Sequence, residues 1–185
     1  DFLLELIKEV LDLSRIETGT IRLLITGINP MAAINDSIAA ANALADARGI
    51  KMVASSENQD LPLIAADEVR FKQVLLNLLS NAVKYNDDDG TVKVDARLTD
   101  AGMVRIAVTD TGAGIADEDH DKVFLPYDRL GRESQNSEGT GVGLTITKSL
   151  IEYMKGEIGF TSKLGEGSTF WIDLPVGVED TGTES

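Results

Sequence analysis

Cysteine is absent from this chain of 185 residues. Its absence excludes disulfide bonds and metal sites built from thiolates, and it is typical of proteins in a reducing compartment. No run of apolar residues approaches the ~18 that a membrane-spanning helix needs, and no signal peptide is recognisable in the sequence. We therefore expect a cytoplasmic domain, and we leave open whether its parent protein is anchored to a membrane.

Positive charge is also scarce. The sequence holds 31 acidic and 17 basic residues, which gives a formal net charge of -14. Such a surface repels nucleic acid and anionic lipid, so neither is expected as a partner. A small anionic ligand such as ATP would need a local site that supplies hydrogen-bond donors and a cation.

Two common signatures of catalysis and nucleotide binding are missing as well. No GxxxxGK[ST] segment is present, which excludes a P-loop. The only histidine, His120, lies in the acidic run ADEDHDKVF, where no neighbour could orient it as a base. We expect this histidine at an exposed helix start rather than in catalysis.

The first segment, 1–18, is predicted to be a helix. Leu3, Leu6, Val10 and Leu13 recur at spacings of three and four residues, which places them on one face. Such a face needs a partner helix in a coiled coil or bundle, or else it packs on the chain's own domain. Because the chain begins inside this pattern, we expect it to be a piece of a longer protein.

Beyond Gly19 the hydrophobic pattern alternates between the periods of strands and helices. We predict strands at 21–28, 51–54, 91–98, 103–109, 157–162 and 168–174, helices at 31–48 and 67–85, and a last helix that the segment 139–144 opens and that runs through Met154. These elements predict an α/β fold, a two-layer sandwich in which helices cover one face of a mixed sheet. The polar residues 177–185 are predicted to be a disordered tail.

The predicted helix 67–85 carries an unusual polar stripe. At helical spacing, one narrow face collects Arg70, Gln73, Asn77, Asn81, Lys84 and Tyr85. Apolar residues flank this stripe on both sides, so we interpret it as the wall of a partly dry cleft. Carboxamides in such a cleft could meet a metal ion or a phosphate. The alternative is the solvated face of an ordinary amphipathic helix.

The strand 103–109 leads into Asp110, which is followed by Gly112 and Gly114 in the segment DTGAGI. A carboxylate at a strand end can accept a hydrogen bond from an exocyclic amine, and glycines let a ligand approach closely. Adenine offers that amine whereas guanine has a carbonyl there, so the pairing would select ATP over GTP. The alternative is a turn in which the aspartate caps the backbone.

A second glycine segment, GTGVGL at 139–144, opens the last predicted helix. Free amides at a helix N-terminus, unshielded by side chains, form a phosphate site. The polar stretch 126–138 before it has few residues that could pack and is a candidate mobile lid. Arg129 at the root of that stretch could reach a terminal phosphate, or could form an ordinary surface salt bridge.

Taken in order, these segments resemble the catalytic, ATP-binding domain of sensor histidine kinases in two-component signalling, which belongs to the GHKL superfamily. NLLSNAVKYN is similar to the N-box, DTGAGI and GTGVGL to two glycine boxes, FLPYDRLG to the F-box, and GEGSTFWIDLP to the last glycine box. The opening VLDLSRIETG resembles the end of the helix that joins the dimerisation and phosphotransfer domain to the catalytic domain. The resemblance implies that 1–18 is this helix end, 19–176 the catalytic domain with the Bergerat-type fold, and 177–185 the tail.

The resemblance also implies that ATP or ADP and Mg²⁺ are the ligands. Asn81 would hold the metal ion, while Asn77, Lys84 and Arg129 would act on the phosphates as the catalytic set. Asp110 would bind the adenine amine. Further nucleotide contacts would come from Tyr85, Gly112, Gly114, Ile115, Gly139, Thr140, Gly141, Val142, Gly143, Leu144 and Ser168, and the packing residues of the F-box would be Phe124 and Tyr127.

One position separates this chain from the related gyrase, chaperone and mismatch-repair ATPases. Those relatives place a glutamate four residues before the metal-binding asparagine, as the base that activates water, and here that residue is Asn77. An amide cannot take a proton at neutral pH, so the γ-phosphate is better kept for another nucleophile. The phosphoacceptor histidine of the kinases would lie upstream of Asp1, and the sequence contains no H-E-x-R-like segment.

We therefore expect a domain that transfers the γ-phosphate of ATP to a histidine on its own dimerisation domain, for relay to an aspartate of a response-regulator receiver domain. The full-length protein would be a homodimer through that dimerisation domain. Two alternatives stay open, namely a nucleotide-binding pseudokinase that serves as a signalling scaffold and a serine kinase of the anti-sigma type.

Overall fold

The computed structural model describes residues 2–56, 60–126 and 141–177. Within these ranges the helices are α1 (Phe2–Glu17), α2 (Pro30–Asp46), α3 (Glu68–Lys84) and α4 (Gly143–Tyr153), with a short 3-10 helix, η1, at Asp117–Lys122. The strands are β1 (Thr26–Ile28), β2 (Lys51–Ser56), β3 (Ile64–Ala66), β4 (Thr91–Leu98), β5 (Met103–Asp110), β6 (Glu157–Lys163) and β7 (Gly167–Pro175).

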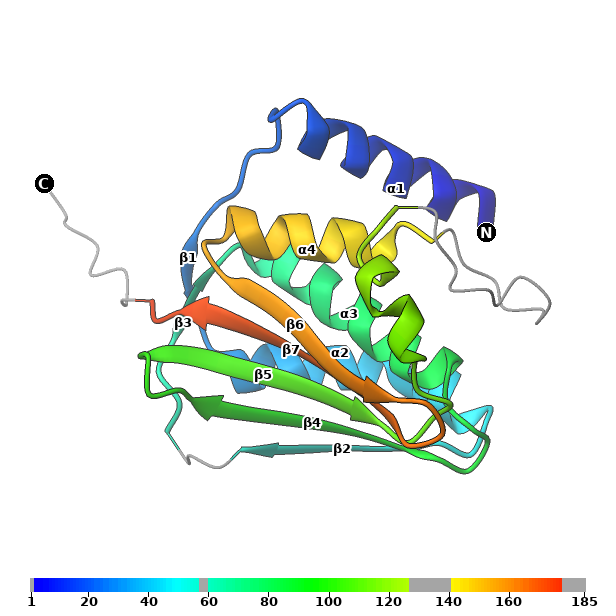
Figure 1. Cartoon of the computed structure of the whole chain (residues 1–185). Helices are drawn as coiled ribbons and strands as arrows, with labels where there is room; N and C mark the ends of the chain where they lie inside the picture. The colour runs from blue at the N-terminus through cyan, green and yellow to red at the C-terminus, as the bar shows by residue number, and fades with distance from the viewer. Residues whose placement is uncertain (1, 57–59, 127–140, 178–185) are drawn as a thin grey trace, which may run out of the picture.

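Five of the strands form one mixed sheet in the order β2-β4-β5-β7-β6. β2 is parallel to β4, and the other neighbouring pairs are antiparallel. Helices α2, α3 and α4 cover one face of this sheet (Figure 1). The predicted two-layer α/β sandwich is therefore confirmed. The short strands β1 and β3 form a separate antiparallel pair.

The central strands alternate between buried and more exposed residues because one face of the sheet meets the helices. On the helix-facing side, β4 and β5 bury Val92, Val94, Ala96, Val104, Ile106 and Val108. These side chains share one core with the apolar face of α3, where Phe71 is fully buried. The alternation seen in the sequence therefore identifies both the strands and the side of the sheet that the helices cover.

Polar side chains fix the beginnings of the two long helices on the sheet. Asn29 accepts a hydrogen bond from the amide of Ala32 at 3.1 Å and stands before Pro30, the first residue of α2. Asp67 accepts in the same way from the amide of Arg70 at 3.0 Å. Its second oxygen accepts from the amide of Leu24 at 2.8 Å, so one carboxylate ties the start of α3 to the segment before β1.

The N-terminal helix uses only part of its apolar face within the domain. α1 packs on α4 (Figure 1), where Leu13 and Ile16 are buried. The hydroxyl of Tyr153 donates to the carbonyl of Ile16 at 3.1 Å. Ile7 and Leu11 stay about half exposed, at 49% and 52%. Packing on the chain's own domain is thus observed, and an apolar surface remains on the helix beside it.

Two details differ from the sequence prediction. The predicted strand 21–28 is regular only over Thr26–Ile28, because its partner β3 is equally short. β3 itself is missing from the prediction, since three residues are too few to display an alternating pattern.

The end of the last strand is tied to the small sheet. The amide of Gly177 donates to the carbonyl of Leu63 at 2.7 Å, and Val176 forms a bridge with Ile64. Residues 178–185, most of the predicted tail, lie outside the described residues. None of the helices in the described ranges is long and apolar enough to cross a membrane.

Candidate functional site

The polar stripe of α3 contacts other helices along its first half, and its six residues are half-buried. Near the start of the helix, Arg70 and Gln73 both donate to the same carboxylate oxygen of Asp12 in α1, each at 3.0 Å. One turn further on, the Asn77 amide nitrogen donates to the hydroxyl of Thr147 in α4 at 2.7 Å. A fully solvated face is therefore wrong for this part of the stripe, and contact with a metal ion or a phosphate stays a prediction.

Asn77 also lies against the beginning of α4. A Cβ atom at Gly143 would collide with the Asn77 carboxamide, so glycine is what allows the two helices to approach here. Val142, immediately before this glycine, is fully buried. The close packing brings a carboxamide to a helix N-terminus, where the first backbone amides have no partner within the helix.

Lys84 and Tyr85 stand where α3 ends. They border a polar hollow of about 320 Å³, which is lined by Arg48, Lys84, Tyr85, Asn86, Asp87, Asp88 and Ala113. The carbonyl of Tyr85 accepts a hydrogen bond from the amide of Ala113 at 3.4 Å. The fold therefore brings the end of α3, the asparagine helix that carries Asn77 and Asn81, beside the first glycine segment. A site shared by the two segments requires this arrangement.

Asp110 is the C-terminal residue of β5 and is only 7% exposed. One of its carboxylate oxygens accepts from the amide of Gly112 at 2.9 Å. This is the capped turn that the sequence offers as the alternative to a base-binding role. An Asx turn of this kind uses one acceptor site among several on a carboxylate, so the role in binding adenine stays a prediction.

The two glycines after Asp110 have a packing reason of their own. At Gly112 a Cβ atom would collide with the carbonyl of Tyr85. At Gly114 the backbone is left-handed, with φ +67, and a Cβ atom would collide with the carbonyl of Lys163. The sequence suggests that glycine is needed here for a ligand to approach. The structure adds that other backbone segments of the same chain pack against both glycines.

A serine that sequence reasoning missed supports this loop. The amide of Ile115 donates to the hydroxyl of Ser162 at 2.8 Å, and that hydroxyl is 2.8 Å from the hydroxyl of Ser168. Ser168 in turn lies opposite Asp110 in the pairing of β7 with β5. A serine within a strand gives no sequence signal of such a role, because it is recognised only by what faces it.

An aromatic cluster closes the side of the site next to β6. The ring of Phe160 stacks on Phe170 at 5.4 Å and receives the edges of Phe124 and His120 at 5.8 Å and 5.1 Å. Phe124 thus packs, as the F-box resemblance implies. The helix expected around His120 is present as η1, but the ring is half-buried rather than exposed, and its Nε2 lies 3.3 Å from the carbonyl of Ile115.

Several predicted site residues lie outside the described residues. These are Tyr127, Arg129, Gly139 and Thr140, so their roles stay predictions. Next to them, Gly141 adopts a left-handed φ of +75, and Leu144 packs against the core as a partly buried side chain. The start of α4 therefore lies beside the other site residues, since Gly143 lies against Asn77.

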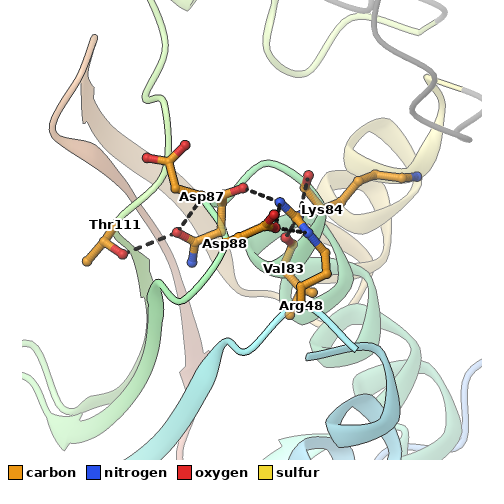
Figure 2. A network of polar contacts seen from close by, with 7 residues as sticks. Arg48, Val83, Lys84, Asp87, Asp88 and Thr111 are labelled. Atoms are coloured by element: carbon orange, nitrogen blue, oxygen red, sulfur yellow. Dashed lines mark hydrogen bonds and ion pairs between the residues drawn. The ribbon is translucent and has the colours of Figure 1, made fainter. Parts of the chain in front are cut away.

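The fold also brings in an arginine that the sequence analysis did not select. Arg48, just after α2, reaches the end of α3 and binds backbone carbonyls on the rim of the polar hollow (Figure 2). Nothing in its local sequence identifies this role, because its partners lie at least 35 residues away along the chain.

Comparison with known proteins finds matches that include the candidate site residues. Residues 66–178 match the family described as histidine kinase-, DNA gyrase B-, and HSP90-like ATPase. The sensor histidine kinase GacS of Pseudomonas protegens is 39% identical over 180 residues, which cover 94% of this chain and 19% of that protein. The chain spans about one fifth of the length of such curated relatives, with 21% and 19% for two of them.

Solved structures agree with this match. The crystal structure of full-length ShkA in complex with AMPPNP has a TM-score of 0.84 and 31% identity, and covers 95% of this chain and 36% of that one. The histidine kinase ThkA in complex with the response regulator protein TrrA has a TM-score of 0.74 and 27% identity, and covers 94% of this chain and 47% of that one. The resemblance in sequence and the fold thus point to the same group of proteins.

The packing role of the glycines can be tested with a matched pair of variants. Gly114→Ala is expected to lower the free energy of unfolding by more than ~2 kcal/mol, because left-handed strain and a backbone collision add up. Gly102→Ala, at φ +74 with nothing within 4 Å, should lower it by only ~1 kcal/mol. Urea denaturation followed by the fluorescence of the single tryptophan, Trp171, would measure both. Equal losses for the two variants would contradict the close approach at Gly114.

Proposed function

The chain belongs to the histidine kinase-, DNA gyrase B-, and HSP90-like ATPase family, as an ATP-binding domain of the sensor histidine kinase type, and we propose that its parent protein is an ATP-dependent autokinase. In this proposal the domain binds ATP and presents the γ-phosphate to a histidine of the parent's own dimerisation domain. The proposal rests above all on Asn77, which stands where the ATPase members of the family carry a glutamate.

The chemistry of Asn77 favours a kinase over an ATPase. A carboxamide cannot accept a proton from water at neutral pH, so this residue cannot act as the base for hydrolysis. Its amide nitrogen is moreover engaged with the hydroxyl of Thr147 at 2.7 Å, beside the start of α4. A side chain held in this way can position phosphate groups, and the γ-phosphate is preserved until a stronger nucleophile approaches.

The proposed nucleotide site extends from the end of α3 to the first glycine segment. Asp110 would accept from the adenine amine, and Lys84 and Arg129 would contact phosphate oxygens. The buried position of Asp110, at 7% exposure, supports this role because a hydrogen bond to a carboxylate is stronger where water is excluded. The crystal structure of ShkA, similar over 95% of this chain, is a complex with AMPPNP, which agrees with a nucleotide as the ligand.

Mg²⁺ fits this site only together with the nucleotide. The described residues contain no group of three or more His, Cys, Asp or Glu side chains that could hold a metal ion. Asn81, half-buried on α3, supplies one neutral oxygen, and Mg²⁺ bound to nucleotides commonly takes few protein ligands beside phosphates and waters. We propose Asn81 as that ligand, with Mg²⁺ neutralising phosphate charge.

The partners follow from the same proposal. The apolar residues that α1 leaves exposed suit a second helix, and we propose that they face the dimerisation domain of the parent homodimer. The ThkA structure is a complex with the response regulator protein TrrA, and a receiver domain of this kind would take the phosphate from the histidine. We further propose the cytoplasm as the location of the domain, because a chain without cysteine suits a reducing compartment.

The preference of the chain for adenine over guanine nucleotides tests the proposed role of Asp110. The chain should bind ADP and ATP much more tightly than GDP and GTP, and Asp110→Asn should weaken adenine-nucleotide binding about 10- to 100-fold, as for the loss of a charged hydrogen bond. Asparagine keeps the side-chain oxygen that accepts from Gly112, so the turn should survive. Calorimetry with each nucleotide measures these affinities, and equal affinity for both purines would rule out the assignment.

Asn81→Ala serves as the matched control for that experiment. It should remove most of the dependence of ATP affinity on Mg²⁺ while the preference for adenine over guanine stays unchanged. If titrations with and without Mg²⁺ differ as much in this variant as in the wild type, Asn81 is not the metal ligand.

The phosphotransfer itself can be tested with labelled ATP. The chain alone should incorporate almost no phosphate, because its one histidine, His120, packs against Phe160 and Ile115. Joined to the dimerisation helices of its parent, it should form an acid-labile, base-stable phosphohistidine, since the acceptor then reaches the γ-phosphate.

The other outcomes of that experiment identify the alternatives. Phosphate on serine or threonine would indicate a kinase of the anti-sigma type. Tight ATP binding without any transfer, in a protein whose dimerisation helices carry a histidine, would indicate a pseudokinase.

A further inference from the structure

Arg48 holds the end of the asparagine helix from outside that helix. One of its terminal nitrogens donates to the carbonyls of Val83 and Lys84, at 2.6 Å and 3.1 Å, and the other donates to the carbonyl of Asn86 at 2.8 Å. These bonds surround the turn that follows α3 (Figure 2). A single guanidinium therefore binds three of the four carbonyls from 83 to 86.

This arrangement suits the physical chemistry of both partners. The last carbonyls of a helix lack partners within the helix and carry the negative end of its dipole. A guanidinium offers five N–H donors in a fixed planar fork, whereas a lysine offers a single nitrogen. Arg48 can therefore bridge carbonyls that a point charge could not reach together.

The ion pair of Arg48 with Asp88 plays a smaller part. Nε of Arg48 donates to the Asp88 carboxylate at 2.9 Å, but the Asp88 side chain is 76% exposed. Exposed ion pairs contribute little to stability. The carboxylate orients the guanidinium, while the bonds to the backbone carbonyls hold the helix end.

The fourth carbonyl of the turn connects it to the first glycine segment. The carbonyl of Tyr85 accepts from the amide of Ala113 at 3.4 Å and lies against Gly112. The side chain of Asn86, which is buried, accepts from the hydroxyl of Thr111 at 3.2 Å. The end of α3 and the loop after Asp110 are thus joined through the turn that Arg48 holds.

We propose that Arg48 is a positioning residue for nucleotide binding: by binding the carbonyls around Lys84 and Tyr85, it sets the end of α3 at a fixed place relative to the Asp110 loop. The inference rests on the proposed nucleotide site and adds to it a residue just after α2 that has no part in the glycine or asparagine segments. Arg48 acts through the backbone of residues 83–86 and needs no contact with the nucleotide.

The test replaces the planar guanidinium of Arg48 by the ammonium group of lysine, which keeps the positive charge. Arg48→Lys is expected to weaken binding of ADP with Mg²⁺ at least tenfold, the size expected for losing one or two charge-assisted hydrogen bonds that hold the site. Calorimetry would be carried out at a temperature at which circular dichroism shows every variant fully folded, so that lower stability alone cannot change the affinity.

Arg105→Lys is the matched control. Arg105 in β5 donates twice to Asp173, both at 2.7 Å, and lies over the ring of Trp171 at 4.0 Å. The hydrogen bond to Asp173 raises the pKa of Arg105. It lies five residues from Asp110, roughly 17 Å along the strand. The control should lose stability but keep its affinity for ADP within twofold.

If Arg48→Lys does not fold, the inference can still be tested by a measurement on the wild-type protein. If the carbonyl bonds of Arg48 favour the binding-competent site, nucleotide must in return favour those bonds. Addition of ADP with Mg²⁺ should then slow hydrogen exchange, measured by NMR, at the terminal Nη–H groups of Arg48, which make the carbonyl bonds, and leave that of the terminal N–H groups of Arg105 unchanged.

The outcomes separate this inference from the proposed function. If the wild type binds ADP and Arg48→Lys binds it within twofold, or if exchange at the terminal Nη–H groups of Arg48 does not respond to ADP, the inference is overturned. If the wild type itself does not bind adenine nucleotides, the proposed function fails first.

Discussion

The backbone contact between the end of α3 and the loop after β5 is the constraint on which the rest of the site depends. Tyr85 presents its carbonyl to the amide of Ala113, at a place where Gly112 leaves no room for a side chain. On the other side of the same loop, Gly114 lies against the carbonyl of Lys163. Because three backbone segments meet without intervening side chains, Asp110 and the asparagine helix are held in one fixed relation.

Partners on neighbouring helices explain why a polar stripe can run along a helix that is otherwise part of the core. Its first residues bind Asp12 of α1 and its middle residue binds Thr147 of α4. Half-buried polar groups are tolerated when each finds a partner. The described residues contain no buried side-chain nitrogen or oxygen atom without a hydrogen-bond partner.

The sequence predicts the parts of this structure that repeat or that carry special residues, and it misses those that depend on distant partners. The alternation in 91–98 and 103–109 predicts β4 and β5 nearly to the residue, because one buried face imposes a period of two. Arg48 and Ser162 give no such signal, since each is defined by groups that only the fold brings near. His120 is misjudged for the same reason: its acidic neighbours indicate exposure, while Phe160, 40 residues away, covers its ring.

An adenine nucleotide is proposed to bind where the end of α3 meets the Asp110 loop. The most direct measurement is an NMR titration of the labelled chain with ADP and Mg²⁺, following every backbone amide. The largest shifts are expected at Tyr85, Gly112 and Ala113, with little change at Lys93 and Arg97 on the uncovered face of the sheet. Shifts that gather on that face, or that spare the Asp110 loop while ADP binds, would contradict the claim.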